Sequence, residues 1–269
     1  MSSPTPHRAR KRFGQNFLTD QGIIRRIVRA ISPLKNQRLL EIGPGQGAIT
    51  ASILDTDCQL DVVELDRDLI PILQGKFGER SNFSIHQGDA LKFDFSALAG
   101  DEKLRVVGNL PYNISTPLIF HLLSAHSCIS DMHFMLQKEV VDRLAAQPGS
   151  KTYGRLSIMA QYYCEVESLF DVPPESFSPQ PKVQSAIVRI TPYKQPPYPA
   201  NDVKLLQSIV RDAFNQRRKT LRNTLKGVIS SAGLEALGVD PGVRPENVSL
   251  ADYVAITNAV GQDRAEQPI

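Results

Sequence analysis

The sequence contains only three cysteines, Cys58, Cys128 and Cys164, and none of them stands in a CxxC pair. This odd, scattered set argues against a disulfide framework and against a zinc site, and it favours a reducing compartment. No apolar run is long enough to span a membrane, and the first residues, MSSPTPHRARKRF, lack the apolar stretch of a signal peptide. We therefore expect a cytoplasmic protein without a membrane or a metal.

The net charge of +3 hides a strong segregation of charge along the chain. Residues 1–40 hold nine Lys and Arg against one Asp, a balance of +8, and residues 211–226 hold six against one Asp, a balance of +5. The rest of the chain therefore sums to −10. Basic segments near both ends of an acidic chain indicate a polyanion contacted from two sides, although two solvated helix faces explain the charge equally well.

The first part of the chain alternates short apolar strands with helical stretches. Residues 20–32 have helical spacing, with Thr19 or Asp20 available as the N-cap. Strands alternating with helices predict an α/β fold, a parallel sheet with helices on both faces. The strands of this sheet are expected at residues 38–43, 59–66, 83–87, 104–111 and 132–137.

The pattern changes after Gly149. Residues 162–172 and 183–191 read as strands that give the sheet an antiparallel end, and YKQPPYP (193–199) is typical of a linker. Beyond it the sequence predicts helices only, at 203–214, 219–229 and 250–260. We predict two domains, an α/β domain over 1–193 and a small all-helical domain over 200–269.

A glycine turn connects the first strand of the sheet to its helix. The stretch EIGPGQGA places Gly43, Gly45 and Gly47 where the backbone can approach a ligand closely. With Ala48 it also satisfies the relaxed dinucleotide-binding pattern, and Glu64, at the end of the second strand, suits ribose hydroxyls in either case. A nicotinamide-dependent oxidoreductase is therefore one candidate function.

Three features favour a different cofactor. Glu41 and Pro44, without a long run of glycine N–H groups, suit a cofactor that lacks a pyrophosphate. Asp89 ends the third strand, where a carboxylate can accept the adenine amino group, although Glu64 and Asp89 would each serve equally well as helix caps. GNLPY then ends the fourth strand at residues 108–112. This ordered set resembles the S-adenosyl-L-methionine-dependent methyltransferases that modify exocyclic amino groups.

The stretch GNLPYNIST explains how such an amino group would be held. The lone pair of adenine N6 is delocalised into the ring, so acceptors around its two N–H bonds would aim it at the methyl donor. Asn109 and the backbone carbonyl of Leu110 or Pro111 are the candidate acceptors, and Tyr112 offers a face on which a base stacks. Methylation of pyrimidine C5 would need a cysteine nucleophile, and none stands near this motif.

From about residue 10 to about residue 260 the chain resembles the ribosomal RNA adenine dimethyltransferases. KRFGQNFLTD (11–20) is similar to the family's N-terminal cofactor motif, which implies that Asn16 and Leu18 touch the methionine end of the cofactor. FSPQPKVQSAIV (177–188) resembles the family's second aromatic motif, which implies that Phe177 stacks on the other face of the target base. The implied fold is a Rossmann-like methyltransferase sheet, and the implied cofactor is S-adenosyl-L-methionine.

The C-terminal helices resemble the small-subunit branch of this family. The resemblance implies dimethylation of N6 on two adjacent adenosines in the 3′-terminal hairpin loop of 16S rRNA, with the small ribosomal subunit as partner and a role in its biogenesis. A binding protein without activity is the alternative, and nothing in the sequence favours a dimer over a monomer. The residues expected to grip RNA phosphates are Arg10, Lys11, Arg12, Arg217, Arg218, Lys219 and Arg222.

Overall fold

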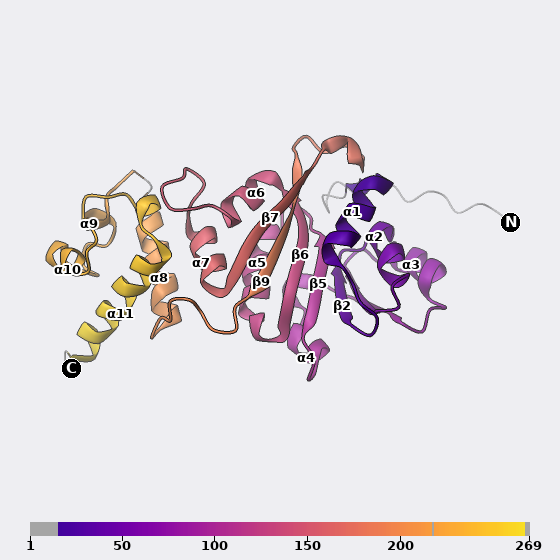
Figure 1. Cartoon of the computed structure of the whole chain (residues 1–269), viewed down its shortest axis with the longest axis horizontal. Helices are drawn as coiled ribbons and strands as arrows, with labels where there is room; N and C mark the ends of the chain where they lie inside the picture. The colour runs from indigo at the N-terminus through magenta and orange to yellow at the C-terminus, as the bar shows by residue number, and fades with distance from the viewer. Residues whose placement is uncertain (1–15, 217, 267–269) are drawn as a thin grey trace. The chain divides into compact units, whose positions relative to one another are not determined.

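The computed structural model describes residues 16–216 and 218–266, which divide into two compact units (Figure 1). The first unit comprises the chain up to Val141 together with Glu167–Pro192, and the second comprises Asp142–Val166 together with the chain from Tyr193 onward. The second unit thus includes a segment that precedes the expected linker. The domain limits of 1–193 and 200–269 stay a prediction.

A seven-stranded sheet organises the first unit, in the order β4-β3-β2-β5-β6-β9-β7. The pairs from β4 to β6 are parallel, whereas β9 runs antiparallel to β6. The predicted α/β class, with an antiparallel end to the sheet, is therefore confirmed. The strands are β2 (Arg38–Ile42), β3 (Gln59–Glu64), β4 (Phe83–Gln87), β5 (Leu104–Asn109), β6 (Ile129–Gln137), β7 (Cys164–Val172) and β9 (Ser185–Pro192).

The strand order reverses between β2 and β5. From β2 the chain moves outward through β3 to β4, and it then returns to β5 on the other side of β2. Because crossovers between parallel strands are right-handed, the helices of the two halves cover opposite faces of the sheet. In such sheets ligands bind outside the carboxyl ends of the strands at the point of reversal.

Three helices share one apolar cluster with the sheet of the first unit. The cluster joins Ile27, Ile53 and Phe77 from helices to Leu39 and Val62 from strands. Asp20 caps the first helix by accepting the N–H groups of Gly22 and Ile23, so the predicted N-terminus is confirmed. The helices of this part are α1 (Gln21–Ile31), α2 (Ala48–Leu54), α3 (Ile70–Phe77), α4 (Phe95–Ala99), α5 (Ser115–Ser124) and α6 (Lys138–Leu144).

The second unit is helical and has a core of its own, which includes Tyr153, Leu206 and Tyr253. The helix predicted over 219–229 is wrong in its extent: only Leu221–Thr224 is helical, and Gly227, with a φ of +84°, lies in the turn that follows. The strand predicted from residue 162 begins only at Cys164. The helices are α7 (Arg155–Tyr163), α8 (Val203–Phe214), α9 (Leu221–Thr224), α10 (Ser231–Ala236) and α11 (Leu250–Glu266). None of the helices in the described ranges is long and apolar enough to cross a membrane.

A separate two-stranded ladder joins segments that are far apart in sequence. β1 (Phe17–Leu18) pairs antiparallel with β8 (Phe177–Ser178), with Leu18 opposite Phe177. Next to this pair, the carbonyl oxygen of Ser176 accepts the N–H and the hydroxyl of Thr19, at 2.9 and 3.2 Å. The sequence gave no expectation of this ladder, because two-residue strands carry no periodicity.

Gly108 allows β2 and β5 to approach closely at the point of reversal. A Cβ atom on Gly108 would lie 2.5 Å from the carbonyl oxygen of Ile42. We therefore expect Gly108→Ala to push the two strands apart and to lower the free energy of unfolding by about 1–3 kcal/mol. Urea denaturation measures this change.

Gly75→Ala is the matched control, since Gly75 lies within α3 with no atom within 4 Å of its ideal Cβ position. Alanine there should stabilise the protein by about 0.5–1 kcal/mol, because alanine favours a helix interior over glycine. Equal unfolding free energies for wild type and Gly108→Ala would contradict the close approach.

Candidate active site

A cavity of about 590 Å³ lies at the carboxyl ends of β2, β3 and β5. Its volume is in the range of small-molecule and cofactor sites. The cavity is where the topology places a ligand site, and its lining comes from segments that are separate in sequence. These segments are residues 16–19, 41–49, 63–65, 88–90 and 109–114.

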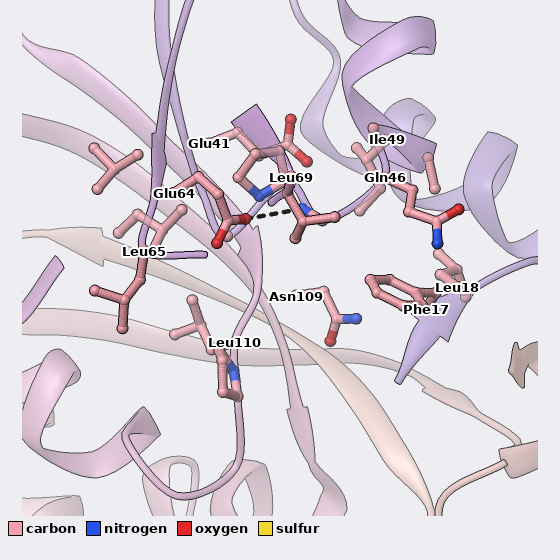
Figure 2. Close-up of a pocket in the computed structure, with 18 of the residues that line it drawn as sticks. Phe17, Leu18, Glu41, Gln46, Ile49, Glu64, Leu65, Leu69, Asn109 and Leu110 are labelled. Atoms are coloured by element: carbon pink, nitrogen blue, oxygen red, sulfur yellow. Dashed lines mark hydrogen bonds between the residues drawn. The ribbon is translucent and has the colours of Figure 1, made fainter. Parts of the chain in front are cut away.

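The glycine turn brings its backbone to the carboxylate of Glu64. Gly43 and Gly45 both have positive φ, +66° and +59°, which favours glycine at these positions. The N–H of Gly45 donates to Glu64 Oε2 at 3.3 Å (Figure 2), and the N–H of Asp66 donates to Oε1 at 2.8 Å. Burial raises the pKa of Glu64, while these two N–H donors lower it. The carboxylate is thus held at the edge of the cavity by the backbone.

Glu41 is a second buried carboxyl group in the cavity wall, where the sequence predicted that it suits a cofactor without a pyrophosphate. It is 2% exposed, and the hydroxyl of Thr50 donates to its Oε2 at 2.6 Å. Burial raises the pKa of Glu41 to about 7, the Thr50 hydroxyl opposes this shift, and the charge of Glu64 adds to it.

Asp89 belongs to the same cavity lining. Its Oδ1 accepts the N–H of Leu91 at 3.0 Å and so caps a short 3-10 helix, Ala90–Lys92. Asp89 therefore acts as a helix cap, which was one of the two roles that the sequence predicted for it. Asp89 is also among the residues that line the cavity, so capping does not remove it from the site.

The side chain of Asn109 is oriented by the N-terminal segment. Its Nδ2 donates to the carbonyl oxygen of Asn16 at 3.2 Å, and no other residue in the described ranges binds its Oδ1. Figure 2 shows Asn109 between Glu64 and Phe17. The amide nitrogen is therefore engaged, and the oxygen remains as an acceptor at the cavity.

The two backbone carbonyls after Asn109 differ in their partners. The oxygen of Pro111 accepts the N–H of Ile114 at 3.1 Å within the loop. The N–H of Leu110 donates to Met135 on β6, also at 3.1 Å, which fixes the peptide next to Asn109. Leu110 and Pro111 both line the cavity. Of their two carbonyl groups, only that of Pro111 accepts a hydrogen bond within the loop.

Tyr112 and Phe177 differ in their access to the cavity. Tyr112 is half-buried, lines the cavity, and its hydroxyl lies 2.8 Å from Ser185 Oγ. Phe177 is 5% exposed, belongs to the core cluster and is not among the lining residues. The structure therefore brings Tyr112, but not the ring of Phe177, to the cavity that contains Asn109.

The predicted contacts at the methionine end of the cofactor lie on the N-terminal segment. Asn16 and Leu18 both line the cavity. Phe17 between them was not predicted; its ring lies 3.2 Å from the ideal Cβ position of Gly45, so it packs on the glycine turn. Leu65 was missed as well: it follows Glu64, lines the cavity and is 49% exposed, and its apolar side chain at a strand end was the available signal.

The described residues among those expected to grip RNA are not part of this lining. Arg218, Lys219 and Arg222 belong to the second unit and are exposed. Arg10, Lys11, Arg12 and Arg217 lie outside the described residues. In residues 16–216 and 218–266, no cluster of three or more His, Cys, Asp or Glu is arranged to hold a metal ion.

The raised pKa of Glu41 predicts a specific pH dependence of stability. The pKa is about 7 in the folded protein and 4.5 for an ordinary glutamate, so this group costs no stability below pH 4.5 and an increasing amount as the pH rises to 7. Glu41→Gln removes the proton equilibrium and keeps a partner for Thr50. Its stability relative to wild type should rise by about 2–3 kcal/mol between pH 5 and pH 8.

Urea denaturation at the two pH values measures this difference. Glu79→Gln, at an exposed position, is the control and should follow the wild type. If Glu41→Gln followed the wild type as well, Glu41 would not be protonated in the folded protein.

Known proteins are similar to this chain over nearly its whole length. A profile of the family described as ribosomal RNA adenine dimethylase matches residues 6–262. Ribosomal RNA small subunit methyltransferase A of Pseudomonas aeruginosa is 64% identical over 263 residues, covering 97% of this chain and 98% of that protein. The protein of the same name from a Marinomonas species is 61% identical, with coverages of 97% and 98%.

Solved structures support the same conclusion about the fold. A dimethyladenosine transferase from Plasmodium falciparum superimposes with a TM-score of 0.79 at 24% identity, over 92% of this chain and 98% of that one. The 23S rRNA methyltransferase ErmE superimposes with a TM-score of 0.73 at 25% identity, over 92% and 100%. The predicted Rossmann-like methyltransferase fold is thus confirmed, and the chain belongs to the ribosomal RNA adenine dimethylase family.

Proposed function

We propose that this protein transfers methyl groups from S-adenosyl-L-methionine to N6 of two adjacent adenosines in the 3′-terminal hairpin loop of 16S rRNA. The product at each position is N6,N6-dimethyladenosine. The observation that carries this proposal is the orientation of Asn109, whose nitrogen is bound to Asn16 and whose oxygen is left as an acceptor at a cofactor-sized cavity. Family membership removes the nicotinamide-dependent alternative.

The residues around the cavity fit the proposed cofactor. Glu64 accepts ribose hydroxyls, Asp89 accepts the adenine amino group, and Gly43 and Gly45 admit the ligand to the backbone. Asn16 and Leu18 contact the methionine end. When bound, the cofactor supplies an electrophilic methyl group on a sulfonium.

The target amino group is held by two acceptors. Asn109 Oδ1 accepts one N–H bond of adenine N6 and the carbonyl of Leu110 accepts the other, since the carbonyl of Pro111 is engaged by Ile114. The contribution of Pro111 is then the backbone geometry that turns the Leu110 carbonyl. No general base is needed, because the N-methylated ammonium is acidic and loses its proton readily, so holding the reactants in line is the main catalytic contribution.

The base is held by stacking. Tyr112 lies beside the acceptors and provides one face of an aromatic sandwich. Phe177 is proposed to provide the other face. Because Phe177 is 5% exposed in the core cluster, its ring has to leave this packing when RNA binds.

The small ribosomal subunit with its 16S rRNA is the proposed partner. Arg218, Lys219 and Arg222 grip phosphates, and Arg10, Lys11, Arg12 and Arg217 are proposed to do the same. We propose that the protein acts in the cytoplasm as a monomer, without a metal or a membrane, and that methylation contributes to small-subunit biogenesis.

Transfer of labelled methyl groups tests the reaction and its substrate. We expect about four methyl groups per small subunit, recovered as N6,N6-dimethyladenosine, when subunits lacking the modification are offered. Naked 16S rRNA and large-subunit RNA are offered in parallel. Label in large-subunit RNA alone would overturn the assignment of the substrate, and no label in any RNA would leave a binding protein.

In the same assay, Asn109→Ala should lower the transfer rate by about 100-fold or more, because N6 loses an acceptor and its alignment. Cofactor binding, measured by calorimetry, should be retained or weakened only moderately. Asn201→Ala, at an exposed position in the second unit, is the control and should transfer at the wild-type rate. Full activity of Asn109→Ala would exclude the proposed clamp.

Replacing Lys219 and Arg222 together by Gln tests the proposed phosphate contacts. RNA binding should weaken similarly for all RNA sequences. A plot of the logarithm of the binding constant against the logarithm of the salt concentration should lose about one unit of steepness for each phosphate contact removed. Lys204→Gln, an exposed lysine on α8, should leave the slope unchanged. An unchanged slope in the double variant would place the RNA elsewhere.

A further inference from the structure

Ser185 is a fully buried polar residue at the start of β9, with 0% of its surface exposed. Its Oγ lies 2.8 Å from the hydroxyl of Tyr112, and this is the only partner of its side chain in the described part of the chain. A buried hydroxyl without a partner is costly, so this contact determines how both side chains are oriented. No role for Ser185 follows from the motifs that identify the family.

The contact reaches the far end of the Tyr112 ring. The backbone of the loop is held at Leu110, which binds Met135, and at Pro111, which binds Ile114. Neither bond controls the rotation of the tyrosine ring about its side-chain torsions. The hydroxyl of Ser185, on β9 between β6 and β7, is the described group that fixes the ring at its tip.

Ser185 also belongs to the segment that carries the second aromatic residue. The connection from Ser176 to Ser185 is bound at its first residue to Thr19 and at its last residue to Tyr112. Both aromatic residues of the proposed sandwich are therefore attached to one segment, Phe177 through the chain and Tyr112 through the hydroxyl of Ser185.

We propose that Ser185 is a positioning residue for methyl transfer, whose hydroxyl holds the Tyr112 ring in the orientation in which it stacks on the target adenine. This inference rests on the proposed function, since the stacked base is the adenosine to be methylated. Ser185 acts through Tyr112 and touches neither the RNA nor the cofactor.

A double-mutant cycle tests the proposal on the full-length protein with small subunits that lack the modification. Ser185→Ala and Tyr112→Phe each remove the contact, and Tyr112→Phe keeps the stacking ring. Each should lower kcat/KM for RNA by about tenfold, the value of one hydrogen bond, and the double variant should lose no more than either single variant. The affinity for S-adenosyl-L-methionine should stay within about twofold of wild type.

Two further variants separate positioning from folding. Ser185→Thr keeps the hydroxyl and should be as active as wild type. Ser168→Ala, at an exposed serine on β7, should equal wild type.

If Ser185→Ala fails to fold, the activity of Tyr112→Phe tests the proposal by itself, because this substitution lies in a half-buried loop and is expected to leave the fold intact. Wild-type activity of Tyr112→Phe, or additive losses in the double variant, would overturn the inference while the proposed function stands. A wild-type protein that transfers no methyl group would overturn the proposed function and this inference with it.

Discussion

The site depends on the close approach of β2 and β5 at Gly108. The carbonyl oxygen of Ile42 lies only 2.5 Å from the place where a Cβ atom would be, so a residue with a side chain would separate the strands. Just beyond this contact, β2 continues into the glycine turn and β5 continues into Asn109. The part of the cavity proposed to hold the cofactor and the part proposed to hold the target base therefore begin side by side, at the reversal of strand order.

Hydrogen bonds between distant segments complete this arrangement. Asn109 binds Asn16, 93 positions away, Thr19 binds Ser176, 157 positions away, and Tyr112 binds Ser185, 73 positions away. Together they join the N-terminal segment, the loop after β5 and the connection into β9. Because each of these segments has little regular structure of its own, its geometry at the cavity comes from these bonds and from the short ladder between β1 and β8.

Buried carboxyl groups give the cavity a character opposite to that of the basic segments. Burial raises the pKa of both Glu41 and Glu64, and the Thr50 hydroxyl and backbone N–H groups partly oppose this shift. The oxygen atoms of these carboxyl groups suit hydroxyl and amino donors, whereas exposed Lys and Arg suit phosphates. The proposed small-molecule site and the proposed phosphate contacts therefore involve different residues of the chain.

The sequence by itself determined the α/β class, the order of most strands and helices, and the family, because these follow from periodicity and from short motifs at strand ends. It also identified Glu64, Asp89, Asn109 and Tyr112, which all line the cavity. Only the tertiary structure decided the ladder between β1 and β8, the burial of Phe177, the raised pKa of Glu41, and the contact between Tyr112 and Ser185. These features depend on contacts between residues far apart in sequence, and on the desolvation that packing imposes, and neither leaves a periodic signal in the chain.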